Sequence, residues 1–151
     1  MGYAEFDPTA DVEGFDATYK ISILSSLAYH KRVPLDKVYR EGISSVSVTD
    51  INIGKELGLT LKLLAISKCA DGKIEARVHP VFVPNSHPIA AVSGSFNAVF
   101  LKGDNVDDIM LYGRGAGALP TGSAIVSDII FAAGKERHSR YPFMSKEVND
   151  A

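Results

Sequence analysis

The sequence contains a single cysteine, Cys69, no tryptophan, no excess of basic residues and no long hydrophobic run. One cysteine cannot form an internal disulfide, which fits a reducing compartment. Lysines and arginines number 16 against 18 acidic residues, a net charge of −2, so we expect no nucleic-acid partner, which would need a basic surface. The most apolar stretch, residues 124 to 133, is interrupted by Ser127 and Asp128 and falls well short of the roughly 20 residues of a membrane-spanning helix. No basic and then apolar leader follows Met1, so we expect a cytoplasmic protein without membrane association.

The residues that most often bind metals or act as thiol nucleophiles are also poorly arranged. Cys69 lies just before the turn dipeptide Asp71-Gly72, with no histidine close to it in sequence, and is predicted to be structural. The four histidines show no metal-ligand spacing, so no metal site is expected. They are His30, His79, His87 and His138.

Length and composition indicate one globular domain. The chain has 151 residues, of which 46% are hydrophobic and 23% charged, and its mean hydropathy is +0.06. Residues 135–151 are charged and aperiodic. We therefore take residues 1–134 as the domain, and residues 135–151 as a tail or the start of a further segment.

The amino-terminal third is predicted to be helical. Apolar residues recur at steps of three and four between Val12 and His30, which predicts an amphipathic helix with Asp11 as its N-cap and a buried stripe. That stripe comprises Phe15, Tyr19, Ile23, Leu24, Leu27 and Ala28. A short helix is expected from Pro34 to Arg40. A third helix should start at a cap formed by Thr49 and Asp50 and run through Leu57, with Gly58 just beyond its end.

From Leu59 the hydrophobic period changes from helical to alternating. Residues 59–65 and 74–79 alternate on either side of Asp71-Gly72, which predicts a β-hairpin. A second antiparallel pair, residues 95–102 and 108–112, flanks the turn signal Gly103-Asp104-Asn105. A final helix is expected from Pro120 to Ala133. This order predicts an α+β fold, a mainly antiparallel mixed sheet with helices on one face, rather than βαβ alternation.

A glycine-rich segment at residues 113–118 fits the pattern GxGxxA between a strand and a helix. A dinucleotide-binding fold would need a second strand ending in an acidic residue about 20 positions further on, and the charged tail follows instead. Two readings stay open. The glycines could let the backbone approach a ligand at the amino end of the helix near Pro120 and Thr121, or they could form a simple strand-to-helix bend.

Acidic residues are crowded into a short acidic loop from Glu5 to Glu13, and beyond it Lys20 follows Asp16 by four positions. On a helix this spacing places Asp16 and Lys20 on one face, and we expect them to project away from Ile23 and Leu27. Most such pairs are solvated surface ion pairs. The crowding of like charges instead favours a site that receives a cationic group, and both interpretations stay open on these residues alone.

The segment from Tyr3 to Lys20 resembles the substrate-binding segment of homoserine dehydrogenases. The resemblance covers residues 2–133, and its further motifs occur in the same order along the chain. These are Glu41-Gly42-Ile43, Asp50-Ile51, Glu56-Leu57-Gly58, Lys62-Leu63-Leu64-Ala65, Arg77-Val78-His79-Pro80, Asn97-Ala98-Val99, and Gly113-Arg114-Gly115-Ala116-Gly117 with Pro120-Thr121.

This resemblance implies the NAD- or NADP-dependent interconversion of L-homoserine and L-aspartate 4-semialdehyde, in the pathway to threonine, isoleucine and methionine. Carried over by position, Glu5 and Asp16 resemble carboxylates that hold the substrate's amino and hydroxyl groups, and Tyr3 and Asp11 line the same pocket. Lys20 resembles the lysine at the reacting oxygen, where it could act as a base or as a charged donor. The family also has a turn that returns the chain to the nicotinamide side of the site. The residues here that resemble it are Gly115, Ala116, Gly117, Pro120 and Thr121.

The resemblance also shows a departure. The family's nucleotide-binding domain, with its GxGxxG motif and another catalytic lysine, has no counterpart in these 151 residues, so we expect the isolated chain to lack useful activity. The family also implies a homodimer formed through the sheet, with apolar strand faces at residues 59–66 and 99–101. Two alternatives remain: the substrate domain of another two-domain dehydrogenase, and a stand-alone binding or assembly module.

Overall fold

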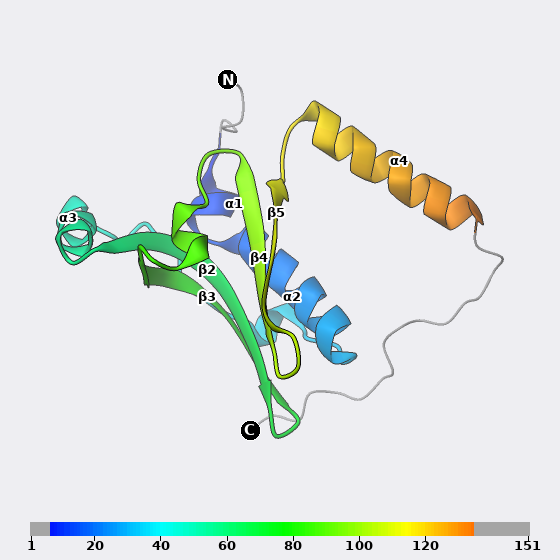
Figure 1. The fold of residues 1–151 in the computed structure, drawn as a ribbon, viewed down its shortest axis with the longest axis horizontal. Coiled ribbons are helices and arrows are strands. Elements are labelled where there is room, and N and C mark those ends of the chain that lie inside the picture. Colours follow the sequence, from blue (N-terminus) through cyan, green and yellow to red (C-terminus); the bar gives the residue numbers. More distant parts are fainter. Residues whose placement is uncertain (1–6, 135–151) are drawn as a thin grey trace. The chain divides into compact units, whose positions relative to one another are not determined.

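The computed structural model describes residues 7–134, which divide into two contact units, residues 7–84 and residues 85–134 (Figure 1). The first unit contains α1 (Thr9–Val12), α2 (Phe15–Tyr29), a 3₁₀ turn (Leu35–Lys37), β1 (Tyr39–Arg40), α3 (Val48–Glu56), β2 (Leu59–Ala70) and β3 (Lys73–Pro84). The second contains a 3₁₀ turn (Pro88–Ala91), β4 (Phe96–Gly103), β5 (Asp107–Arg114) and α4 (Ala118–Gly134).

A long antiparallel hairpin of β2 and β3 is the central element of the first unit (Figure 1). Its register runs from Leu59 opposite Pro84 to Ala70 opposite Lys73, and the short strand β1 lies parallel to β3 at the other edge, giving the order β1-β3-β2. The turn residues Asp71 and Gly72 have φ values of 51° and 76°, as a two-residue type I′ turn requires. The predicted hairpin is confirmed, and its strands extend further than the alternation indicated.

The core of the first unit lies between α2 and this hairpin. Val78, on β3, is completely buried. The buried apolar cluster is Val33, Val38, Ala76 and Val78, against which Ala17, Ile21, Leu63 and Ile74 pack. Helix α3 contacts β2 on the same face, where Leu59, Leu61 and Leu63 line a cavity of about 440 Å³ beside it. The predicted arrangement of helices on one face of a sheet is therefore confirmed for this unit.

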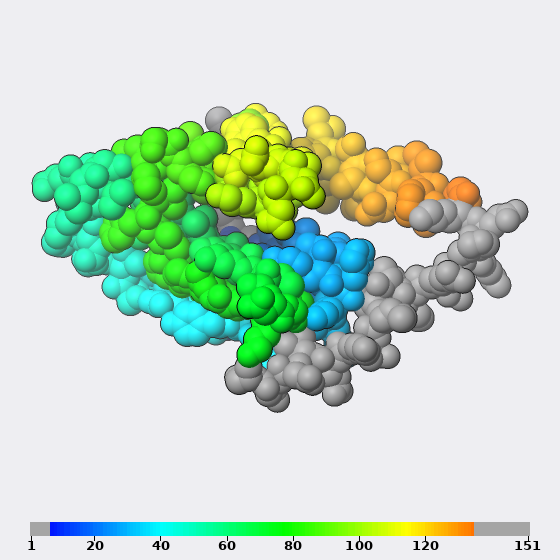
Figure 2. All heavy atoms as spheres, turned by 60° about the horizontal axis from the view of Figure 1, so that its bottom comes forward, coloured from blue at the N-terminus to red at the C-terminus, as the bar shows by residue number. Residues whose placement is uncertain are grey.

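Helix α2 buries the opposite face from the one predicted. Its apolar stripe is exposed, with exposed fractions from 37% for Phe15 to 59% for Ile23, and atoms of α2 form part of the surface in Figure 2. The buried side chains are instead short hydroxyl residues: Thr18, Ser22, Ser25 and Ser26.

The hydroxyl groups of Thr18, Ser22 and Ser26 allow α2 to approach the rest of the unit closely because they are hydrogen-bonded to backbone atoms, whereas the buried Ser25 hydroxyl has no hydrogen-bond partner among the described residues. The Ser22 hydroxyl donates to the Val33 carbonyl at 2.6 Å, and the Val33 N–H donates to the Ser26 oxygen at 2.9 Å. The spacing of apolar residues therefore identified which side chains share a face of α2. It did not identify the buried face, which small hydrogen-bonded residues occupy.

The single helix predicted from Val12 to His30 is interrupted. Gly14 adopts a left-handed conformation with φ 75° and separates α1 from α2, so Asp11 lies within α1 and is not the N-cap of the long helix. The predicted short helix at Pro34 to Arg40 is reduced to the 3₁₀ turn, and β1 follows it.

Helix α3 starts with a capping box two residues before the predicted cap at Thr49. Ser47 is the N-cap and accepts from the Asp50 N–H, while the Asp50 carboxylate accepts from the Ser47 N–H at 2.9 Å. The Ser47 hydroxyl, and then its N–H, lower the pKa of the Asp50 carboxyl group. Gly58 follows the helix with φ 72°, as predicted.

The second unit consists of a two-stranded antiparallel sheet followed by a helix. Strands β4 and β5 pair from Phe96 opposite Arg114 to Gly103 opposite Asp107, which confirms the second predicted hairpin. Helix α4 has no buried residue. Among residues 7–134, none of the helices combines the length and the hydropathy that a membrane-spanning helix needs. The α+β class is confirmed, with the strands distributed over two sheets.

Candidate functional site

Asp16 and Lys20 form an ion pair in the first turns of α2. The Lys20 Nζ lies 2.5 Å from Asp16 Oδ2, and the side chains are 63% exposed for Lys20 and 44% exposed for Asp16. A solvated pair with this i, i+4 spacing stabilises a helix by only about 0.3–0.5 kcal/mol. The pair therefore contributes little to folding, and both groups are accessible to a ligand.

The pair shares its face of α2 with Ile23 and Leu27, contrary to the expectation that it would project away from them. Positions 16, 20, 23 and 27 follow one another at helical steps of four, three and four, so they form one stripe. Ile23 is 59% exposed and Leu27 is 48% exposed. The charged pair thus continues into an exposed apolar stripe, and the two features form one surface.

The acidic loop before α2 is described in part. Asp11 is exposed on α1, five positions before Asp16. The Asp7 carboxylate accepts from the Thr9 N–H at 3.0 Å, and hydrogen bonds from Thr9, first from its side chain and then from its backbone, lower the pKa of Asp7. Tyr3 and Glu5, the other two predicted substrate residues, lie outside the described residues.

The turn that joins α1 to α2 requires a glycine. A side chain at Gly14 would meet Val78 Cγ1 at 3.0 Å, and the φ of 75° is unfavourable for other residues. The Thr18 hydroxyl donates to the Gly14 carbonyl at 2.8 Å. This close packing on β3 sets where α2 begins, and so where Asp16 and Lys20 lie.

The glycine-rich segment joins β5 to α4 in the second unit. Gly117 has φ 116°, and a side chain at Gly115 would overlap the Asn97 amide, so neither position accommodates another residue easily. A cavity of about 420 Å³ borders the segment. It is lined by Arg114, Ala116, Gly117, Ala118, Leu119 and Pro120.

The start of α4 differs from the prediction. The helix begins at Ala118 rather than near Pro120, and the Thr121 N–H already donates to the Gly117 carbonyl at 3.0 Å. The N–H groups of its first residues are therefore those of Ala118 and Leu119, because Pro120 has none. Among the five predicted cofactor residues, Thr121 consequently has no free backbone donor to offer.

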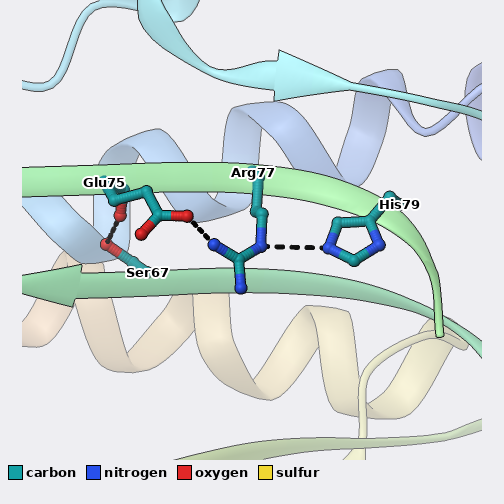
Figure 3. Close-up of polar contacts among 4 residues, drawn as sticks. All are labelled: Ser67, Glu75, Arg77 and His79. Carbon is teal, nitrogen blue, oxygen red and sulfur yellow. Dashed lines mark hydrogen bonds and ion pairs between the residues drawn. The ribbon is translucent and has the colours of Figure 1, made fainter.

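Arg77 and His79, which belong to one of the family-like motifs, are engaged with each other on β3 (Figure 3). The Arg77 Nε donates to His79 Nε2 at 3.0 Å, so the His79 proton lies on Nδ1, 3.0 Å from the Pro80 carbonyl. Arg77 also pairs with Glu75, whose carbonyl accepts from the Ser67 hydroxyl. The side chains of Glu75, Arg77 and His79 are thus engaged with groups of the hairpin itself. Within residues 7–134, no three His, Cys, Asp or Glu side chains are grouped to hold a metal ion.

Sequence reasoning missed Arg40, which lies beside the α1–α2 turn. Its guanidinium carbon is 3.7 Å from the centroid of the Phe15 ring. The motif Glu41-Gly42-Ile43 directly after Arg40 could have pointed to this region. Its glycine is required by the structure, because a side chain at Gly42 would come within 2.8 Å of both the Val12 carbonyl and Glu13. The motif therefore marks the place where the chain passes closely against the acidic loop.

The sequence of this chain is similar to those of known proteins of one family. The family model described as "Homoserine dehydrogenase" matches residues 1–130. The homoserine dehydrogenase of Corynebacterium glutamicum is 50% identical over 99% of this chain and 35% of its own length, and that of Bacillus subtilis is 45% identical over 86% and 30%.

Solved structures agree in fold as well as in sequence. The homoserine dehydrogenase of Staphylococcus aureus at pH 7.5 aligns with a TM-score of 0.81 and 46% identity, over 87% of this chain and 33% of that one. A hyperthermophilic archaeal homoserine dehydrogenase mutant in complex with NADPH aligns with a TM-score of 0.71 and 32% identity, over 92% and 39%. The chain spans about a third of the length of these relatives. It belongs to the homoserine dehydrogenase family.

Proposed function

We propose that this chain supplies the substrate-binding part of an enzyme that interconverts L-homoserine and L-aspartate 4-semialdehyde with NAD or NADP. The observation that carries the proposal is the exposed pair of Asp16 and Lys20 at the start of α2, next to the acidic loop. Homoserine presents an ammonium and a hydroxyl group, which suit carboxylates and a neighbouring lysine respectively.

The roles of the residues follow from the charges of the reaction. Oxidation of the alcohol removes a hydride from carbon and a proton from oxygen, and the reverse reaction develops negative charge on that oxygen. The Lys20 ammonium would stabilise this charge, or its neutral amine would take the proton. Asp16 would orient Lys20 through their ion pair and accept from the substrate, while Glu5, Asp11 and Tyr3 would complete the pocket.

The glycine-rich segment is suited to the nicotinamide side of the cofactor. The side chain of Asn97 lies against Gly115, while Ala116 and Gly117 border the neighbouring cavity, which, with Pro120 and Thr121 in the first turn of α4, would leave space for a planar ring. The cofactor supplies hydride transfer when bound. The choice between NAD and NADP depends on a ribose pocket that we assign to another part of the whole protein. We propose residues 1–134 as the family domain of a cytoplasmic enzyme, with residues 135–151 leading out of it.

The test is steady-state reduction by a full-length protein that contains this chain, with NADH and NADPH as alternative reductants. We expect kcat/KM to be highest for L-aspartate 4-semialdehyde and at least tenfold lower for butanal, which lacks the ammonium and carboxylate groups. Equal or higher kcat/KM for butanal would favour another two-domain dehydrogenase.

We further propose that the whole protein is a homodimer formed through the sheet. On β4 and β5, one face carries four apolar side chains with exposed fractions of 36% to 60%: Val99, Leu101, Ile109 and Leu111. An exposed apolar face of this kind is typical of protein interfaces. In the hairpin of β2 and β3, the apolar residues at 59–66 are half-buried apart from the exposed Ala65, and Leu59, Leu61 and Leu63 lie beside α3, so that unit offers less exposed apolar surface.

Replacing Leu111 with asparagine should weaken this dimer. Burying a leucine side chain stabilises an interface by about 2 kcal/mol, so the dissociation constant should rise at least tenfold. Light scattering across a dilution series of the full-length protein measures the dissociation constant of the dimer. Lys102→Asn, on the opposite face of the same hairpin, is the matched control, and equal dissociation constants for the two variants would place the interface elsewhere.

A further inference from the structure

Arg40 holds the turn that leads into α2 by two different contacts. Its guanidinium carbon lies 3.7 Å from the centroid of the Phe15 ring, and its NH1 donates to the Glu13 carbonyl at 2.5 Å. Phe15 is the first residue of α2, and Glu13 is the last residue before Gly14. The half-buried Arg40 therefore clamps both sides of the left-handed glycine from which α2 starts.

The segment after Arg40 secures the same turn from a second direction. The Ile43 N–H donates to the Val12 carbonyl at 2.9 Å, and the Ser44 hydroxyl bonds to the Glu13 carboxylate. Arg40 itself is fixed on the sheet, because β1 pairs with β3 at Val78. The turn is thus tied to the rigid core, and Arg40 supplies the contacts nearest to α2.

The charge of Arg40 is not explained by helix stability. The amino end of a helix carries partial positive charge and is stabilised by anions, so a guanidinium there is electrostatically unfavourable. An arginine is nevertheless suited to the observed geometry, because its planar group can stack on an aromatic ring and donate a hydrogen bond at the same time. A lysine offers a point charge and cannot reproduce both contacts.

We propose that Arg40 is a positioning residue for the substrate site: by clamping Glu13 and Phe15 it fixes the direction in which Asp16 and Lys20 are presented to the substrate. This inference rests on the proposed function. Asp16 follows Phe15 directly, so a displaced Phe15 moves the ion pair with it. Misplacement of a reacting group by about 1 Å can lower turnover about 100-fold.

The test uses the full-length protein and the variants Arg40→Met and Arg40→Lys. For Arg40→Met we expect kcat with L-homoserine to fall about 10- to 100-fold and KM for L-homoserine to rise, while KM for the nicotinamide cofactor stays within twofold of wild type. Arg40→Lys should recover only a small part of the loss. Arg77→Met is the matched control, since Arg77 is also a half-buried arginine of this sheet but contacts Glu75 and His79 (Figure 3).

Chemical rescue separates positioning from general loss of structure. For Arg40→Ala, adding ethylguanidinium should raise turnover at least fivefold, whereas ethylammonium at the same concentration should not. If the Arg40 variants do not fold, Phe15→Leu removes the ring beneath the guanidinium and should lower kcat in the same direction by a smaller factor.

Wild-type kcat and homoserine KM in Arg40→Met, or an equal loss in Arg77→Met, would overturn the proposal. Failure of the proposed function gives a different result, because Lys20→Ala would then leave turnover unchanged. If Lys20→Ala loses turnover while Arg40→Met keeps it, the inference about Arg40 is wrong and the proposed function stands.

Discussion

Replacing Lys20 by alanine in a full-length protein lowers turnover of L-homoserine by two to four orders of magnitude, if the proposed role is correct. Removing a positioned charge donor or a general base commonly has an effect of about this size. The fold should remain intact because the Lys20 side chain is 63% exposed and its ion pair contributes little to stability. Steady-state kinetics measure the loss, and thermal unfolding checks the fold.

Lys31→Ala is the control for this substitution. Lys31 follows α2 closely in sequence, and its ammonium donates to the Gly72 carbonyl at 2.9 Å, away from the acidic loop. Turnover should therefore be unchanged. Unchanged turnover in Lys20→Ala would refute the assigned role.

Lys20→Arg distinguishes the two roles that remain open for Lys20. Arginine stays charged across the working pH range, so it can stabilise a developing alkoxide but cannot accept a proton. A charged donor predicts that Lys20→Arg retains part of the turnover that Lys20→Ala loses. A general base predicts that both variants are equally inactive.

The second large effect is the loss of dehydrogenase activity in the isolated 151-residue chain. Its relatives are about three times as long, and the nucleotide pocket of the proposed enzyme is assigned to the remainder. We expect no NADPH-dependent reduction of L-aspartate 4-semialdehyde above the rate without protein, with a full-length protein as the positive control. Reduction by the chain alone would show that these residues hold the cofactor unaided.

Local signals predicted the four strands of the two hairpins well, but they missed β1, which lies within the segment expected to be a short helix and pairs with β3 far along the chain. Alternation from Leu59 and the dipeptide Asp71-Gly72 together specify a hairpin, because a type I′ turn needs two residues with positive φ and the alternation sets the faces. The second hairpin was found in the same way around Gly103. These elements depend on contacts close in sequence, so the chain itself carries the information.

The helices show where sequence reasoning stops. The apolar stripe of α2 was expected to be buried, yet Thr18, Ser22 and Ser26 are buried because their hydroxyl groups bond to backbone atoms. Those partners include Val33, which is distant in sequence. The interruption at Gly14 depends likewise on the close approach of Val78, which periodicity does not report.

The candidate site was predicted in part for the same reason. Asp16 and Lys20 could be paired from their spacing of four residues, and the ion pair is present. Arg40 could not be assigned, because it reaches Phe15 from a strand 25 positions further along the chain. Tertiary contacts of this kind require the fold.

The central claim is that the start of α2 receives the substrate, and a crystal structure of the full-length protein with bound L-homoserine tests it most directly. The account predicts the hydroxyl oxygen of homoserine within about 3 Å of the Lys20 Nζ, with the ammonium group bonded to carboxylates of the acidic loop. Homoserine bound elsewhere, with neither Asp16 nor Lys20 in contact with it, would contradict the account.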